Sequence, residues 1–227
     1  MKKYIIAFLA FLFAGILVGC GDDKEKEIEE SAAGEKVEIT EAEKVDESDI
    51  VAVVNGDDIK GETYNLVYSQ LKLHAGTFEE EVDNNEIKQA TMESLIDRQL
   101  LLQQAKEEGV EVTDEVVDSE FETIKSENKE ALDTLLEQYQ ITEEGFKDQL
   151  KFELTLNEFL AKTIEVTVTD EEVKEQYEKA KEGNDSIPEF DEIKDQLKKQ
   201  LLQQKTDEAL QAKIDKVKEK SEIEEKI

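Results

Sequence analysis

The amino-acid sequence predicts a mostly α-helical domain with a long C-terminal helix and a small β element near its two ends. Apolar residues recur at helical spacing through most of residues 60–220, which predicts a series of amphipathic helices. Three of those helices share one start signal. Residues 51–54 are β-prone, and Ile223 and Ile227 predict a final edge strand that lies beside them.

The composition narrows the functional classes. The chain of 227 residues holds 59 acidic and 28 basic residues, which give a formal net charge of −31. Such a charge repels anionic polymers, so no nucleic-acid partner is predicted. The sequence contains no glycine-rich phosphate loop, nucleophile motif or cluster of metal-ligand residues. We therefore predict no catalytic residue, no metal site and no cofactor.

The most explicit helix of the chain ends in a clear stop signal. Residues 87–105 carry an apolar stripe that widens to about half of the helix circumference. Gly109 stands where a left-handed residue closes a helix, and Val110 is placed to contact Ala105 in a Schellman ending. A helix with so wide an apolar surface needs cover on more than one side.

Three helices share one start signal. Thr113, Thr142 and Thr169 are each followed by two acidic residues. Threonine caps the first amide groups of a helix, and acidic side chains stabilise its positive end. Val112 and Val117 add the spacing of a hydrophobic staple to the first of these starts. Helices are therefore predicted to begin near residues 114, 143 and 170.

The remaining elements follow from shorter patterns. Asn55 and Gly56 favour a tight turn between the strand at residues 51–54 and a return strand at Ile59. Alternating apolar residues over 164–168 predict another short strand. Helical spacing predicts further helices over residues 64–74, 121–128, 131–139 and 190–217.

The helix that begins near residue 143 is apolar on two faces. At 100° per residue, its apolar side chains fall into two groups. One group is Phe146, Leu150 and Leu154, and the other is Phe152, Leu156 and Phe159. This helix is therefore expected to contact neighbours on both sides.

Residues 1–19 are predicted to be a lipoprotein signal peptide. Two lysines precede an apolar run that is shorter than the roughly 20 residues needed to span a membrane. The run ends in Leu17, Val18, Gly19 and Cys20, the pattern of a bacterial lipobox. Cleavage before Cys20 would leave its sulfur to carry a diacylglyceryl lipid. An uncleaved anchor is the alternative, and both place the remaining chain outside the cytoplasm, on the extracytoplasmic face of the cell membrane.

Residues 20–49 are predicted to be the lipidated cysteine followed by a disordered acidic tether. Residues 21–49 hold thirteen acidic residues, four lysines and no aromatic residue. That composition buries too little apolar surface to offset the entropy of ordering. Because the chain has a single cysteine, the domain of residues 50–227 must be held by its core without a disulfide.

Four segments of this domain resemble, in the same order, those of the SurA-type and PrsA-type extracytoplasmic chaperones. They are the strand and turn of residues 51–59, the helix, stop and restart of residues 95–117, residues 166–181 and residues 190–205. The resemblance covers nearly all of residues 50–227. It implies the helical N-terminal chaperone domain of that family.

The resemblance also shows what is missing. The family commonly carries a parvulin prolyl isomerase domain where only twelve residues separate Tyr177 from Phe190. The isomerase site of the family uses paired histidines, and this chain has only His74, which we expect at the surface or its boundary. We therefore predict a chaperone domain over residues 50–227 with no parvulin insertion and no enzymatic activity.

The resemblance implies a lipid-anchored, ATP-independent chaperone that holds unfolded or partly folded exported polypeptides. Its partners are those polypeptides and the membrane, through Cys20. Arg98, the only arginine, is expected to pair with a carboxylate in a structural role. The candidate client contacts are aromatic residues that we expect to be exposed, namely Tyr64, Tyr68, Phe121, Tyr139 and Phe152.

Two other hypotheses stay open. One is a prolyl isomerase of the same family. The other is a scaffold lipoprotein that binds a specific membrane or wall partner through a sheet edge or the C-terminal helix. A homodimer is kept as an alternative assembly.

Overall fold

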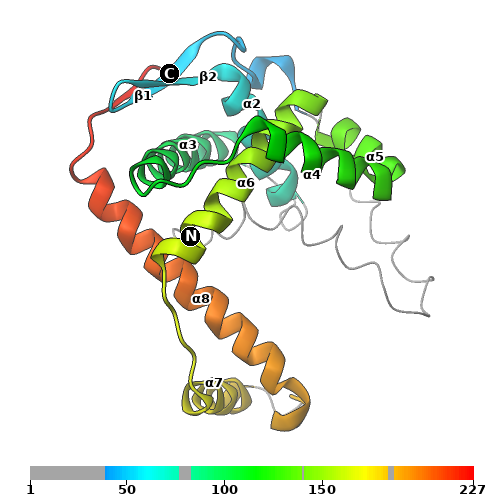
Figure 1. Cartoon of the computed structure of the whole chain (residues 1–227), viewed down its shortest axis with the longest axis vertical. Coiled ribbons are helices and arrows are strands. Elements are labelled where there is room, and N and C mark those ends of the chain that lie inside the picture. Colours follow the sequence, from blue (N-terminus) through cyan, green and yellow to red (C-terminus); the bar gives the residue numbers. More distant parts are fainter. Residues whose placement is uncertain (1–38, 77–82, 140, 184–186) are drawn as a thin grey trace.

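The computed structural model describes residues 39–76, 83–139, 141–183 and 187–227. Seven α-helices and one three-stranded sheet make up these ranges, which confirms the mostly α-helical fold class (Figure 1). Within them, no helix is both long enough and apolar enough to cross a membrane. The signal peptide, the lipobox and Cys20 lie outside the described residues.

The sheet joins the two ends of the described chain. Strand β1 (Ile50–Val54) turns into β2 (Asp57–Lys60) through Asn55 and Gly56, whose φ angles of 52° and 88° fit a tight hairpin. Strand β3 (Ile223–Glu225) pairs antiparallel with β1, which gives the order β2-β1-β3. The predicted C-terminal edge strand is thus confirmed.

Helix α3 (Asn84–Glu107) lies at the centre of the fold and contacts α2 (Gly61–Gly76), β1, α6 and α8. It ends as its sequence predicts. Gly109 has a φ of 71°, its amide donates to the Lys106 carbonyl at 3.0 Å, and the Val110 amide donates to the Ala105 carbonyl at 2.8 Å. These are the two hydrogen bonds of a Schellman motif.

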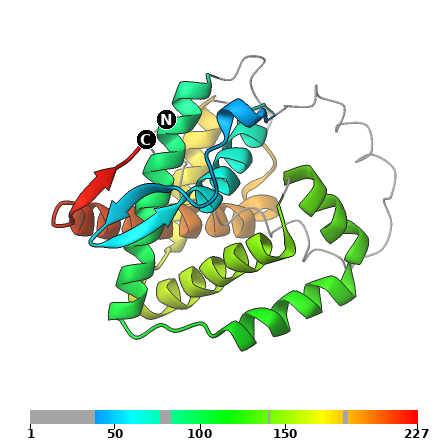
Figure 2. The ribbon, with the colours of Figure 1, turned by 90° about the horizontal axis from the view of Figure 1, so that it is seen from above.

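Helix α6 (Glu143–Thr163) separates two apolar cores, as its two apolar faces predict. Its first face packs against α4 (Asp114–Glu127) and α5 (Lys129–Tyr139), where Phe146 and Leu150 join the smaller core. Its second face, with Phe152, Leu156 and Phe159, joins the larger core formed with the sheet, α2, α3 and α8. Figures 1 and 2 show α6 between α3 and the α4–α5 pair.

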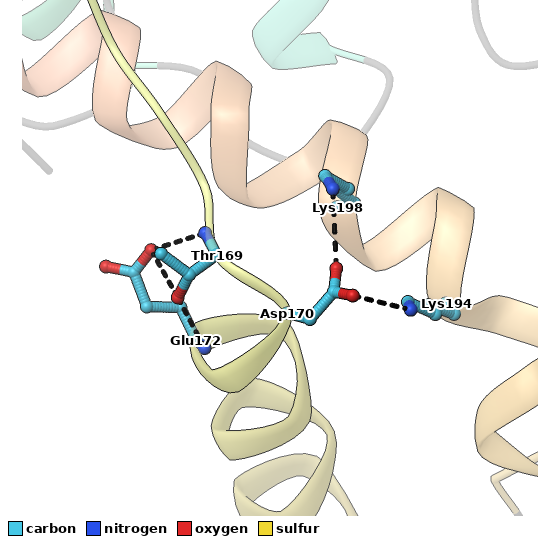
Figure 3. A network of polar contacts seen from close by, with 5 residues as sticks. All are labelled: Thr169, Asp170, Glu172, Lys194 and Lys198. Carbon is cyan, nitrogen blue, oxygen red and sulfur yellow. Dashed lines mark hydrogen bonds and ion pairs between the residues drawn. The ribbon is translucent and has the colours of Figure 1, made fainter.

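Helices α7 (Asp170–Gly183) and α8 (Phe190–Lys218) pack against each other, and α7 lies at the end of α8 that is far from the sheet (Figure 1). Asp170 accepts hydrogen bonds from Lys194 at 3.1 Å and from Lys198 at 3.4 Å (Figure 3). Residues 164–169 connect α6 to α7 without forming a strand. The predicted strand is wrong, because none of the described strands pairs with this segment.

The three predicted helix starts are confirmed, although their caps differ. The Gly145 amide donates to Thr142 Oγ1 at 3.0 Å. Thr169 and Glu172 form a reciprocal capping box, in which the Thr169 amide donates to the Glu172 carboxylate at 2.9 Å and the Glu172 amide donates to Thr169 Oγ1 at 3.2 Å (Figure 3). Thr113 occupies the N-cap position, but its side chain makes no capping hydrogen bond.

Residues 39–49 pack on the domain, which corrects the prediction that the disordered tether extends to residue 49. A short 3₁₀ helix, η1 (Glu41–Glu43), brings Glu43 against α2, where its carboxylate accepts hydrogen bonds from Lys72 and from Tyr68 at 3.2 Å. The Val45 amide donates to Asn65 Oδ1 at 3.0 Å, and Asn65 Nδ2 donates to the Val45 carbonyl at 2.9 Å. The acidic composition of this segment does not reveal that it packs on the domain. Only one of its carboxylates, that of Glu43, is buried, and Lys72 pairs with it.

Glu43 provides a pH test of this packing. Burial alone raises the pKa of Glu43, but hydrogen bonds from Lys72 and Thr40 outweigh it and lower the pKa from 4.5 to about 2. Such a carboxylate stabilises the fold above its unfolded pKa and loses that contribution as the pH falls toward its folded pKa. In residues 21–227, we predict that Glu43→Gln lowers the free energy of unfolding at pH 7 by about 1–3 kcal/mol.

The difference between Glu43→Gln and the wild type should shrink as the pH falls from 4.5 toward 2, measured by denaturant unfolding. Glu41→Gln is the matched control, because the Glu41 side chain is 92% exposed and should change stability little. A Glu43→Gln difference that stays constant over this pH range would contradict the assignment.

Candidate functional site

A cleft of about 530 Å³ opens between three parts of the fold. One wall comes from β2 and α2, the floor from α3, and the other wall from the end of α5 and the first half of α6. Residues 44–47 add Lys44 and Glu47 to its rim. The apolar side chains that line it are Ile59, Leu66, Leu95, Leu102, Tyr139, Ile141 and Phe152.

The rim of the cleft carries charges of both signs. Three lysines and four acidic residues lie among the lining side chains, so their charges nearly cancel. These residues are Lys44, Lys60, Lys151, Glu47, Asp58, Glu62 and Asp148. A cleft with apolar side chains inside and charged side chains at its rim suits a segment that buries side chains while its backbone stays hydrated.

Arg98 enters the cleft from α3 and is 8% exposed. Its guanidinium lies 4.1 Å from the centre of the Phe152 ring, and its Nη1 donates to Gln149 Oε1 at 2.5 Å. Nη2 donates to the Asp148 carbonyl at 3.3 Å. The predicted pairing of Arg98 with a carboxylate is wrong. Its direct partners in the described chain are an amide, a carbonyl and a ring.

A buried polar row extends from Arg98 along α6. Gln149 Nε2 donates to Glu153 Oε1 at 3.1 Å, so Gln149 separates the guanidinium from that carboxyl group. Burial lowers the pKa of Arg98 to about 10, while the charges of Asp148 and Glu153 oppose the decrease. Burial also raises the pKa of Glu153 to about 7, against the effects of Gln149 and Arg98. Arg98 thus stays charged at neutral pH.

Four of the five candidate contacts, which were expected to be exposed, are buried. They are Tyr64, Tyr68, Phe121 and Phe152. Tyr64 and Tyr68 stack with ring centres 5.9 Å apart and are buried beneath residues 39–45. Phe121 is buried in the smaller core, 5.9 Å from the Phe146 ring. Helical spacing shows that a side chain lies on an apolar face, but not which segment covers that face.

Two of the five candidates do line the cleft. Tyr139 is half-buried at the end of α5, and Phe152 is buried with one side against the cleft. Sequence reasoning did not single out Leu66, Leu102 and Ile141, because the pattern shows that these side chains are apolar but not that they line a cleft. His74 is exposed on α2 and is not among the cleft residues, in agreement with its predicted place at the surface.

A comparison with known families identifies the class of this domain. Residues 2–160 match the family of SurA-like N-terminal domains, and the chain belongs to that family. The matched range ends within α6 and includes every residue that lines the cleft.

One curated relative is the foldase protein PrsA of Caldanaerobacter subterraneus subsp. tengcongensis. It is 30% identical to this chain over 196 residues, which cover 81% of this chain and 54% of the relative. The chain therefore spans about half the length of the relative that it matches. No solved structure matches the chain. The family supports a role in protein folding.

The raised pKa of Glu153 predicts a pH dependence of stability. A carboxyl group whose pKa rises on folding stabilises the fold below its unfolded pKa of 4.5 and loses that contribution as the pH rises through about 7. Glu153→Gln keeps the neutral form at every pH. We predict that the melting temperature of Glu153→Gln, relative to wild type, increases by about 2–4 °C or more between pH 5 and pH 8.

Glu158→Gln is the control for this measurement, because Glu158 is exposed on the same helix. Its difference from wild type should be the same at both pH values. If the melting temperatures of wild type and Glu153→Gln differ by the same amount at pH 5 and at pH 8, Glu153 does not titrate in this range.

Proposed function

We propose that this protein is a lipid-anchored, ATP-independent chaperone that holds unfolded or partly folded exported polypeptides. The observation that carries the proposal is the cleft of about 530 Å³ between α2, α3 and α6, in a member of the SurA-like N-terminal domain family. Holding requires only that apolar client surface be shielded until the client folds. The cleft offers apolar side chains for that purpose.

The proposed activity is holding rather than prolyl isomerisation. The rings of Tyr177 and Phe190 pack edge to face with centres 5.3 Å apart, and the Tyr177 hydroxyl donates to the Pro188 carbonyl at 3.2 Å. Only twelve residues separate these two rings in the sequence, which is too few to form an isomerase domain between them. His74 is the only histidine of the sequence. Both facts support a chaperone that does not catalyse isomerisation.

The proposed anchor is the lipid on Cys20, after removal of residues 1–19. Ile39 is buried at the start of the described domain, so at most the segment between Cys20 and Ile39 separates the domain from the membrane. That segment is shorter than the tether of residues 20–49 that composition predicts. The domain would then stay close to the outer surface of the membrane, where exported chains emerge.

The cleft predicts which substitution reduces holding. We predict that Tyr139→Ala requires several-fold more chaperone than wild type to suppress aggregation of an unfolded exported protein, measured by light scattering. Tyr139 is half-buried in the cleft wall, so its removal should affect binding more than folding. Val116→Ala is the control, because Val116 is 50% exposed on α4 and is not among the cleft residues.

Equal suppression of aggregation by wild type and Tyr139→Ala would contradict the assignment of the cleft as the client-binding site. A proline-peptide assay on the same preparation should give the uncatalysed rate, and acceleration would favour the isomerase hypothesis. Crosslinking in cells separates the scaffold hypothesis, because a scaffold gives one dominant partner and a chaperone gives many.

Lipidation predicts a change of location. Cys20→Ala should move the protein from the membrane fraction to the soluble or secreted fraction, or leave it as an unprocessed precursor in the membrane. In both cases, Cys20→Ala should no longer incorporate a labelled fatty acid. Lipid labelling that persists in Cys20→Ala would contradict the assignment of Cys20, and Gly34→Ala, which lies beyond the lipobox, is the control.

A further inference from the structure

The floor of the cleft holds a positive charge that no described carboxylate pairs directly. Arg98 has five N–H groups, and the structure gives acceptors for two of them, on Gln149 and on the Asp148 backbone. Across the described ranges, no carboxylate lies within 4.0 Å of its guanidinium. A buried guanidinium is costly unless its remaining donors and its charge are satisfied.

The two carboxyl groups that influence Arg98 are both held away from it. Glu153 accepts a hydrogen bond from Gln149, which stands between Glu153 and the guanidinium. Asp148 is exposed, and it offers Arg98 its backbone carbonyl rather than its side chain. The guanidinium therefore faces the cleft with donors that neither group uses.

We propose that the cleft recognises client segments that carry a carboxylate, and that this carboxylate binds Arg98. The proposal rests on the proposed function, because it assigns a chemical class to the clients of the same cleft. A carboxylate fits the planar fork of a guanidinium with two parallel hydrogen bonds. Leu66, Leu102 and Tyr139 would contact apolar side chains on either side of that carboxylate.

This preference opposes the overall charge of the protein. A net charge of −31 repels acidic peptides at long range, and dissolved salt screens that repulsion. A contact with a nearly buried guanidinium is screened much less. The preference for a carboxylate should therefore increase as salt is added, whereas a general attraction between surface charges would decrease.

The carboxylate has two sources, an acidic side chain or the C-terminus of a client. The test uses the full chain in lipid nanodiscs and fluorescence anisotropy of three labelled peptides with one apolar sequence. The first peptide has a central Gln and capped ends, the second replaces that Gln with Glu, and the third keeps Gln but has a free C-terminal carboxylate. Relative to the first peptide, we expect about tenfold tighter binding of the second peptide, the third or both. Tighter binding of the second identifies an acidic side chain as the source, and tighter binding of the third identifies the C-terminus.

Two substitutions test the residues. Arg98→Gln should abolish the preference, so that the carboxylate peptides and the capped Gln peptide bind with about equal affinity. This substitution also removes a buried group and affects the fold. Asp148→Asn avoids that problem, because Asp148 is exposed on the rim. Removing its competing charge should tighten binding of the carboxylate peptides a few-fold more than it changes binding of the capped Gln peptide. Glu144→Gln is the control, because it removes one exposed charge from the same helix outside the cleft.

The outcomes are distinguishable. Equal affinities for the three peptides would overturn the inference and leave the holding function in place. Tightening by Glu144→Gln as large as that by Asp148→Asn would assign the effect to general charge and also overturn it. Failure of all three peptides to bind would overturn both this inference and the cleft as the client site.

Discussion

The structure depends on one helix that must be covered on two sides. Helix α6 places Phe146 and Leu150 in the smaller core and Phe152 in the larger core, so the elements before and after it cannot merge into a single layer. The boundary between its faces carries Gln149 and Glu153, which are polar and buried. The cleft lies beside this boundary, between α6 and the end of α5 on one side and the α2–α3 pair on the other.

Burial of polar groups along that boundary links packing to chemistry. A charged Arg98 is retained in the interior because Phe152 contacts its flat face and Gln149 accepts one of its donors. Glu153 lies one helical turn further along α6 and is held toward its neutral form by burial. The floor of the cleft is therefore positive, while most of the protein surface is negative.

The two ends of the described chain meet on the same side of the molecule. Strand β3 adds to β1, and the segment that includes Glu43 and Val45 packs on α2, so that Glu43 and Glu225 line one shared cavity. Helix α8 leads away from β3, and α7 lies at its far end (Figure 1).

The sequence by itself determined the local elements and the fold class. Gly109 requires a left-handed backbone, Thr142 and Thr169 satisfy orphan amides, and the two apolar faces of α6 follow from spacing alone, because all of these are interactions within a few residues. Only the tertiary structure decided the site. Residues 39–45 cover Tyr64 and Tyr68, and the cleft combines Leu66 of α2, Leu102 of α3 and Ile141 of the loop before α6. Periodicity identifies the apolar face of each helix, but exposure depends on which distant segment packs against that face.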